Sequence, residues 1–445
     1  MDWQLLIAVV FGVVVLLSLI LRLKVHPFLA LLIASIVVGI GAGLAPDLLF
    51  EHLVSGIGGT LGFVATIVGL GAIMGAILEK SGGAASLASW MISRSGEDKA
   101  PWALMLAGFF VAIPVFFDVA FIILLPMAIA IKNKTQKPLL LYAMPLLAGL
   151  AITHAFIPPT PGPVAVADIL GADIGWVILF GAIVGLPVAV VSGPILAQYV
   201  SRYVRSPEVQ HPSSLSHEYV SPQSVLLIIL FPITLVIAQT IVKSSPTLGQ
   251  HIPGYLADMI IVVGHPFSAL ILANLLAWYF LGIRKGFTRG QLLDVSSDSF
   301  RQAGAIILLT GAGGGFKQIL IETGAGTMIA DSLGGSSLPP VLFCFVVATI
   351  VRVVQGSSTV AMVTAAGFTA PLIPLFGVSE LEKAVLVIAI ASGASMTSHV
   401  NDSGFWLVQQ YLGLTEKQTF QTWTLMTTII GLTGFIVCCG LMWLL

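Results

Sequence analysis

The sequence predicts an all-α polytopic membrane protein with about ten full spans, built as an inverted-repeat secondary transporter. Its 445 residues are 57% hydrophobic and only 9% charged, whereas roughly 25% of the residues in soluble domains are charged. The mean hydropathy is +1.03. Apolar runs of spanning length recur along the whole chain, and two of them are interrupted by residues that a helix cannot accommodate.

The first interrupted run contains the stretch His154–Pro163, which has four prolines within its last six residues. Proline removes a backbone donor and clashes one turn back, so the helix must break here. A second break is expected at Ser398–Gly404. Broken backbone at membrane depth is tolerated where it is buried in protein or lines a cavity. Two interrupted spans at matching places in two halves indicate a binding site, so we expect the two breaks to face each other around the solute.

Composition excludes several other classes of protein. The net charge of −1 gives no basic field for a nucleic-acid partner. The three cysteines lie in apolar runs without metal-binding or disulfide spacing, which favours packing roles. Zincin, serine-hydrolase and paired-cysteine motifs do not occur in the sequence. We therefore predict no catalytic residues, no metal site and no enzyme activity. The first apolar run lacks a basic leader and a cleavage site, which indicates a retained span.

The spans follow from runs of roughly 20 apolar residues. They are predicted at residues 3–21, 28–45, 57–78, 139–170 (broken), 176–200, 224–242, 259–282, 303–321, 384–412 (broken) and 422–445.

Two further apolar regions, 101–131 and 339–376, have polar residues near their middles. Basic residues at 80–99 precede the first region and those at 132–137 follow it, and both clusters belong in the cytoplasm by the positive-inside rule. A single span would put one basic cluster outside, whereas a re-entrant hairpin keeps both clusters in the cytoplasm. Its arms of about 14 residues are too short to cross. By the same reasoning the second region is a hairpin entered from outside, and both termini lie outside. The alternative is that both regions are ordinary helix pairs, which gives more spans.

An internal repeat relates the two halves of the chain. A shift of 242 residues places Gly162 on Gly404 and Gly171 on Gly413, and brings Asp118 near the pair Ser357 and Ser358. The order of span, hairpin, broken span and span recurs as well. Five spans separate corresponding elements, and an odd number predicts that the halves are inverted.

Asp118 stands at the expected tip of the inner hairpin. A carboxylate at this depth is costly unless it is paired, protonated or hydrated. We expect Asp118 to carry the coupling proton or to accept a hydrogen bond from a substrate hydroxyl. The alternative is that it only caps the broken backbone.

The tip of the outer hairpin contains Arg352, Gly356, Ser357, Ser358 and Thr359. Gly356 would let the backbone approach a ligand closely. The three hydroxyls lie at an expected helix N-terminus, which suits an anion. Arg352 either attracts a substrate carboxylate or pairs with a nearby acid, and the sequence leaves both open.

The two breaks supply further candidates. Substrate contacts are expected from Thr160, Pro161, Gly162, Asn401, Asp402 and Ser403. Asp402 is also a candidate for proton coupling, as are His154 and His399, because histidine titrates near neutral pH. The alternatives are that the polar side chains of the breaks only satisfy freed backbone groups and that the two histidines are structural hydrogen-bonding residues.

Several stretches together resemble the gluconate permease family of bacterial sugar-acid:proton symporters. They are Phe116-Phe-Asp-Val-Ala120, His154-x-Phe-x-Pro-Pro-Thr-Pro-Gly-Pro163, Gly171-Ala-Asp-Ile-Gly175, Gln355-Gly-Ser-Ser-Thr-Val-Ala361 and Ser398-His-Val-Asn-Asp-Ser-Gly-Phe-Trp406. The resemblance covers essentially the whole chain. One departure is Thr160, where the family's pattern has histidine. This difference affects the expected identity of the transported acid and leaves the expectation of transport unchanged.

The resemblance implies proton-driven uptake of gluconate or a related hydroxy acid across the bacterial inner membrane, with both termini periplasmic. It also implies a homodimer with a scaffold and a mobile, elevator-type transport domain, and no cofactor beyond the coupling proton. The expected parts are N-terminal scaffold spans at 1–56, a first repeat at 57–200, a cytoplasmic linker at 201–223, further scaffold spans at 224–302 and a second repeat at 303–445.

Other functions remain open from the sequence. One is sodium-coupled transport of a di- or tricarboxylate. Others are transport of D-serine, idonate, fructuronate or glycerate, a passive channel, and an intramembrane enzyme that uses Asp118 and Asp402 as a carboxylate pair.

Overall fold

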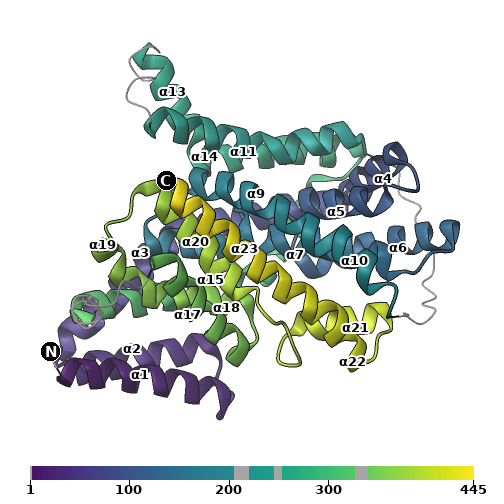
Figure 1. Ribbon diagram of the computed structural model, residues 1–445. Coiled ribbons are helices and arrows are strands. Elements are labelled where there is room, and N and C mark those ends of the chain that lie inside the picture. Colours follow the sequence, from purple (N-terminus) through teal and green to yellow (C-terminus); the bar gives the residue numbers. More distant parts are fainter. Residues whose placement is uncertain (1–2, 205–219, 245–252, 326–338) are drawn as a thin grey trace.

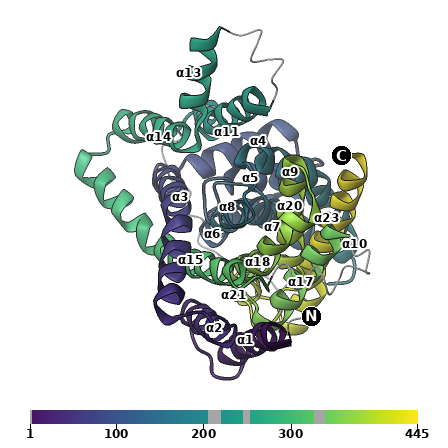
Figure 2. The ribbon, with the colours of Figure 1, turned by 90° about the vertical axis from the view of Figure 1, so that its left-hand side faces the viewer.

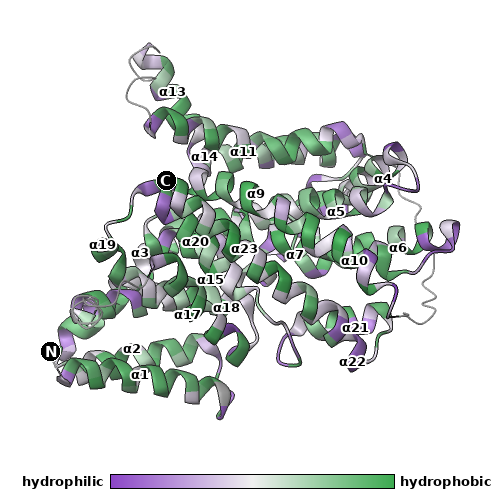
Figure 3. Ribbon diagram, viewed as in Figure 1, coloured by the Kyte–Doolittle hydropathy of each residue, from purple (hydrophilic) through white to green (hydrophobic). Residues whose placement is uncertain are grey.

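The computed structural model describes residues 3–204, 220–244, 253–325 and 339–445. All regular secondary structure in these ranges is helical (Figure 1). Nine of the described helices are long and apolar enough to cross a membrane. Hydrophobic residues run along the helices, while hydrophilic residues gather at the ends of elements such as α4, α6 and α22 (Figure 3). The prediction of an all-α polytopic membrane protein is therefore confirmed. Most of the predicted linker at 201–223 falls outside the described residues.

The first half begins with two short helices and continues into a long one. Its elements are α1 (Trp3–Leu21), α2 (Pro27–Gly41), α3 (Pro46–Lys80), α4 (Gly83–Ser95), α5 (Ala100–Val111), α6 (Phe117–Thr135), α7 (Leu140–Phe156), α8 (Pro161–Leu170), and a last helix made of α9 (Ile174–Val190), η1 (Val191–Ile195) and α10 (Leu196–Val200). Proline stands in the first turn of α2, α3, α5 and α8, where its missing donor costs nothing.

The second half repeats this order. Its elements are α11 (Pro222–Ser244), α13 (Gly254–Gly264), α14 (Pro266–Ala277) with η2 (Trp278–Gly282) and η3 (Ile283–Lys285), α15 (Arg289–Glu322), α17 (Pro340–Gln355), α18 (Ser358–Thr369) with η4 (Ala370–Leu372) and α19 (Ile373–Phe376), α20 (Glu380–Ala394), α21 (Ser403–Leu412), and a last helix made of α22 (Glu416–Thr419), η5 (Phe420–Thr424) and α23 (Leu425–Leu444).

Several predicted boundaries were wrong. The spans predicted at 57–78 and 303–321 belong to helices of 35 and 34 residues, because the polar first turns of α3 and α15 look like loops in the sequence. The span predicted at 28–45 is only 15 residues long. The span predicted at 259–282 is divided at His265, the N-cap of α14, and α13 projects away from the helices below it (Figure 1).

A helix pair occurs at each predicted hairpin, but the predicted arm length of about 14 residues was wrong. The arms α5 and α6 have 12 and 19 residues, and α17 and Ser358–Phe376 have 16 and 19. The longer arms could cross a bilayer by length alone. What makes these elements hairpins is the position of their tips, which both line one interior cavity.

Equivalent elements of the two halves make equivalent contacts. His26 and His265 each cap the helix that begins at the next proline, and each Nδ1 accepts a hydrogen bond of 3.3 Å from the following phenylalanine N–H. The long helices α3 and α15 pack on each other, with Gly56 beside Gln318 and Gly69 beside Phe300. The two helices therefore run antiparallel, which is the relation that an inverted repeat requires. Figure 2 shows them side by side, flanking the hairpins and broken helices.

Candidate functional site

A cavity of about 370 Å³ lies where the two hairpin tips meet the two broken helices, within the usual size range of small-molecule sites. The tip of α5–α6 supplies Phe116, Phe117 and Asp118, and the last turn of α7 supplies His154. Further polar lining comes from the tip of α17–α18 and from the second break, at Arg352, Ser357, Ser358, Thr359, Asp402 and Ser403. Residues of α2, α15 and α23 complete the wall.

Three helices begin at this cavity. Phe116, Ser357 and Asp402 are the N-caps of α6, α18 and α21, and all three line the cavity. The first N–H groups of a helix lack intrahelical partners, and the helix dipole places partial positive charge there. The converging N-termini therefore favour a negatively charged group in the cavity.

Arg352 is the strongest single indication of what the cavity binds. Its side chain is only 3% exposed, and Nη2 lies 2.6 Å from Oδ2 of Asp402. The other two guanidinium nitrogens, Nε and Nη1, are buried and have no hydrogen-bond partner among the described residues. Buried donors are rarely left unsatisfied, so an acceptor from outside the described residues is expected beside them.

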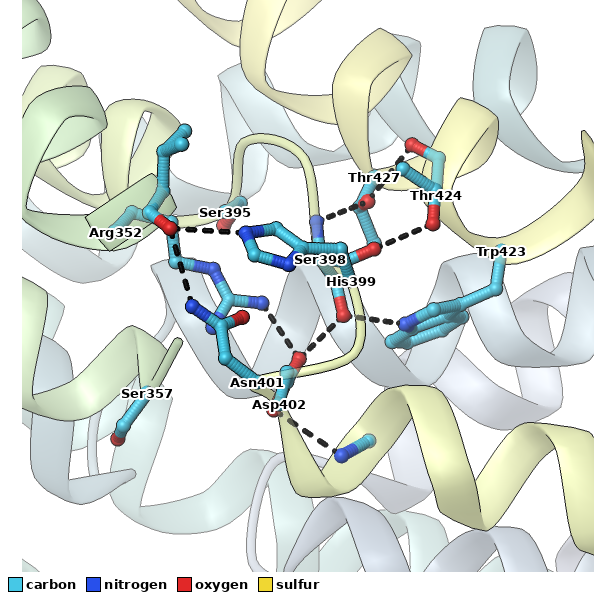
Figure 4. A network of polar contacts seen from close by, with 12 residues as sticks. Arg352, Ser357, Ser395, Ser398, His399, Asn401, Asp402, Trp423, Thr424 and Thr427 are labelled. Carbon is cyan, nitrogen blue, oxygen red and sulfur yellow. Dashed lines mark hydrogen bonds and ion pairs between the residues drawn. The ribbon is translucent and has the colours of Figure 1, made fainter. Parts of the chain in front are cut away.

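Asp402 is held by a network of donors, drawn in Figure 4. Oδ2 accepts hydrogen bonds from Arg352 and from the Ser398 hydroxyl, and Oδ1 accepts one of 3.1 Å from the Gly404 N–H. The indole Nε1 of Trp423 donates to the Ser398 oxygen at 2.6 Å. The Asp402 carboxyl group thus accepts hydrogen bonds on both of its oxygens.

Asp118 contrasts with Asp402. Its side chain is exposed to the cavity, and it makes no hydrogen bond or ion pair with any other described residue. Nothing on the described chain therefore fixes this carboxyl in one protonation state. Of the two acids in the cavity, Asp118 is the one whose carboxyl group has no hydrogen-bond or ion-pair partner among the described residues.

His154 and His399 have different surroundings. His154 lines the cavity, its Nδ1 is buried without a partner among the described residues, and its ring meets Phe116 edge-on. His399 lies outside the lining, and its Nε2 is 2.9 Å from the carbonyl oxygen of Val353.

The Asn401 side chain also contacts backbone carbonyl groups. Its amide nitrogen lies 3.1 Å from the Val353 carbonyl oxygen and 3.4 Å from that of Val354, at the end of α17. Gly356 has φ +92°, and a Cβ on it would lie 2.7 Å from the Asn401 carbonyl carbon. His399 and Asn401 therefore contact carbonyl oxygens that have no partner within α17. This agrees with the alternative stated above, in which polar side chains of the breaks satisfy freed backbone groups. The structure does not bring Gly356, His399 or Asn401 to the cavity lining.

The first break lies behind the inner hairpin tip instead of in the main cavity. Thr160 is 5% exposed, and its hydroxyl donates to the Ile157 carbonyl oxygen at 2.6 Å. Gly162 packs against Met362, whose sulfur would lie 2.6 Å from an added Cβ. Thr160 and Pro161 line only a small void shared with Pro114–Phe116. From the two breaks, only Asp402 and Ser403 of the expected substrate contacts reach the cavity.

Sequence reasoning missed Ser398, Trp423 and Thr427. Ser398 stands inside the second break, so its position in the sequence could have identified it as a candidate. Trp423 and Thr427 belong to a predominantly apolar C-terminal span with several scattered threonines, and nothing in the sequence marks the face of that span that reaches the cavity. Their roles depend on tertiary packing against the second break.

The sequence profile of the GntP family permeases matches residues 4–445. The chain belongs to the GntP permease family. A gluconate permease of Pseudomonas aeruginosa is 37% identical, over 98% of this chain and 97% of the relative. A low-affinity gluconate transporter of Escherichia coli is also 37% identical, over 96% and 95%. The Gnt-II system L-idonate transporter of Escherichia coli is 35% identical, over 97% of each chain.

Two solved structures resemble this GntP-family permease in fold. The Alcanivorax borkumensis YdaH transporter has a TM-score of 0.63 at 15% identity, with 90% of each chain covered. Neisseria gonorrhoeae MtrF has a TM-score of 0.62 at 14% identity, with 97% of this chain and 94% of that chain covered. The likeness extends to the helical fold over most of each chain.

Proposed function

We propose that this permease takes up gluconate, or a closely related hydroxylated monocarboxylate, together with protons across a bacterial inner membrane. The observation that carries the proposal is Arg352, a buried guanidinium with two unpaired nitrogens beside a cavity where three helices begin. An arginine fork matches the geometry of a carboxylate. Relatives named for gluconate and for L-idonate, two sugar acids, support this substrate class.

The substrate would be oriented by groups on opposite walls. Its carboxylate would take the unpaired guanidinium nitrogens of Arg352 and the N-terminus of α18. Its hydroxyls would exchange hydrogen bonds with Ser357, Ser358 and Thr359, of which Ser358 has a buried hydroxyl oxygen without a partner among the described residues. Asp402 is then the fixed counter-ion of Arg352 and not the proton carrier.

Charge arithmetic gives a reason for coupling. With Asp118 and Asp402 ionised and His26 and His154 neutral, two negative charges face the single positive charge of Arg352, so the empty cavity has one net negative charge. A substrate anion alone would raise this to two negative charges, which is costly in a low-dielectric surrounding. If Asp118 binds a proton as the anion enters, the loaded and empty cavities carry the same charge. Substrate and proton would then move together.

The remaining assignments belong to the same proposal. Both termini would lie in the periplasm, because the basic residues around α4, α6 and α10 then lie in the cytoplasm. The protein would act as a homodimer with scaffold and transport parts, and as a transporter without enzyme activity.

Uptake into proteoliposomes tests the proposal. Labelled gluconate should accumulate under an acid-outside pH step, collapse of the gradient should stop accumulation, and replacing sodium with choline should change nothing. Dependence on sodium would favour the alternative cation-coupled carrier, and uptake that survives gradient collapse would favour a channel. A thermal-shift screen with gluconate, idonate, D-serine and citrate would then rank the substrates.

A further inference from the structure

A second cavity, of about 250 Å³, lies on the other side of the inner hairpin tip. We call it the inner vestibule and define it by Glu79 and Lys80 of α3, Phe116 and Val119 of the hairpin, and Asp298 of α15. The vestibule lies at the end of α3 that charge placement puts in the cytoplasm, because basic residues flank α4 and α6 there.

The hairpin tip separates the two cavities. Phe116 lines both of them. Asp118 lines the substrate cavity, while its neighbour Val119 lines the vestibule. The tip rests directly on α3, since a Cβ on Gly75 would lie 3.0 Å from the Pro114 carbonyl carbon. Phe116 therefore belongs to the wall between the substrate cavity, which Asp118 lines, and the vestibule.

Glu79 is the unpaired acid of the vestibule. Its side chain is exposed there, and it makes no hydrogen bond or ion pair with another described residue. The charged groups that face it are Lys80, its neighbour on α3, and Asp298 on α15. Asp298 is already paired with Arg301 at 3.1 Å. The hairpin wall opposite is apolar. Glu79 stands in the last turn of α3, beside Lys80, so its carboxyl lies at the end of the helix that lines the vestibule.

We propose that the coupling proton leaves the substrate cavity past Phe116 into the inner vestibule, where Glu79 takes it up before release to the cytoplasm. The inference rests on the proposed function, because it assumes that Asp118 carries the proton. In this step the Asp118 carboxyl gives up its proton and becomes a carboxylate, water carries the proton past the barrier, and the Glu79 carboxylate accepts it. The substrate anion needs no part in this route.

The test replaces Glu79 with glutamine in proteoliposomes. Gluconate accumulation under an acid-outside pH step should fall about tenfold or more, because a proton acceptor is removed from the path. Gluconate-for-gluconate exchange, which needs no net proton release, should stay within about twofold of wild type. A pH-sensitive dye inside the vesicles should report slower substrate-dependent acidification. Glu79→Asp, which keeps the carboxyl, should restore part of the accumulation.

Asp298→Asn is the matched control, since it removes a vestibule acid that already has a cationic partner, and it should accumulate gluconate like wild type. The inference is overturned if Glu79→Gln accumulates and acidifies like wild type, or if Asp298→Asn loses as much as Glu79→Gln. A loss of exchange together with accumulation in Glu79→Gln also overturns it, because that result indicates a structural role. Failure of the proposed function itself looks different: Asp118→Asn would then still accumulate gluconate.

Discussion

Arg352 on α17 and Asp402 at the start of α21 form a buried ion pair, with Nη2 and Oδ2 2.6 Å apart. The pair joins the outer hairpin to the second broken helix and leaves two guanidinium nitrogens without a partner among the described residues. We expect Arg352→Lys to weaken gluconate binding by about 10- to 100-fold, because hydrogen bonds to charged groups contribute roughly 1.5–3 kcal/mol and lysine cannot form the fork. Isothermal titration calorimetry on purified protein measures this directly. A lysine variant that binds gluconate as wild type does would remove Arg352 from the site.

Neutralising the two cavity acids should give different defects. Asp118→Asn should abolish accumulation under an imposed pH step and keep exchange, whose rate should become nearly independent of pH. Asp402→Asn should instead lower stability, because losing one partner of a buried pair costs about 3–5 kcal/mol, and it should weaken binding because Asp402 no longer holds the Arg352 side chain in place. Transport and binding assays on both variants separate the roles. If both variants still concentrate gluconate, neither acid carries the proton.

Gly356 should not tolerate a side chain. Its φ of +92° lies outside the regions that alanine favours, and the new Cβ would press on Asn401. We expect Gly356→Ala to lower the free energy of unfolding by about 2 kcal/mol or more, visible as a lower thermal midpoint in detergent. Gly62→Ala in α3 is the control, because no atom lies within 4 Å of the added Cβ. Equal midpoints for the two variants would contradict the described packing.

Thr160 should affect stability and leave selectivity unchanged. Its hydroxyl bonds to the Ile157 carbonyl inside the first break and does not reach the cavity. Thr160→Ala should cost about 1 kcal/mol for the lost hydrogen bond and leave the ratio of gluconate to idonate uptake as in wild type. Competition uptake with both acids is the measurement. A changed ratio would show that position 160 contacts substrate in another state of the transport cycle.

Trp423 should position Asp402 through Ser398. Trp423→Phe removes the donor that bonds to the Ser398 oxygen, which should cost about 1 kcal/mol and raise the KM for gluconate by up to about tenfold. The control is Trp443→Phe, since Trp443 is 85% exposed. An unchanged KM in Trp423→Phe would argue that Ser398 holds Asp402 without help from the indole.

Much of the architecture could be predicted because apolar length, proline and charge placement act locally. The breaks at His154–Pro163 and Ser398–Gly404 and the two hairpins follow from rules of this kind. Asp118 and Arg352 could be identified from the sequence because a charged side chain within a membrane span is costly unless it is paired or has a function. The side on which each break presents its polar groups could not be predicted. Thr160 turns back to its own backbone, whereas Asp402 faces Arg352, and only the packing of neighbouring helices decides between these outcomes.

The contacts of His399 and Asn401 with the end of α17 limit how the carrier can alternate. Pulling the outer hairpin away from the second break would separate the carbonyl oxygens of Val353 and Val354 from the side chains of His399 and Asn401, and unsatisfied carbonyls at membrane depth are costly. The outer hairpin and the second broken helix are thus held together through main-chain acceptors. We therefore expect the bound acid to reach opposite sides by displacement of this block as one piece, with the sliding surface elsewhere in the molecule.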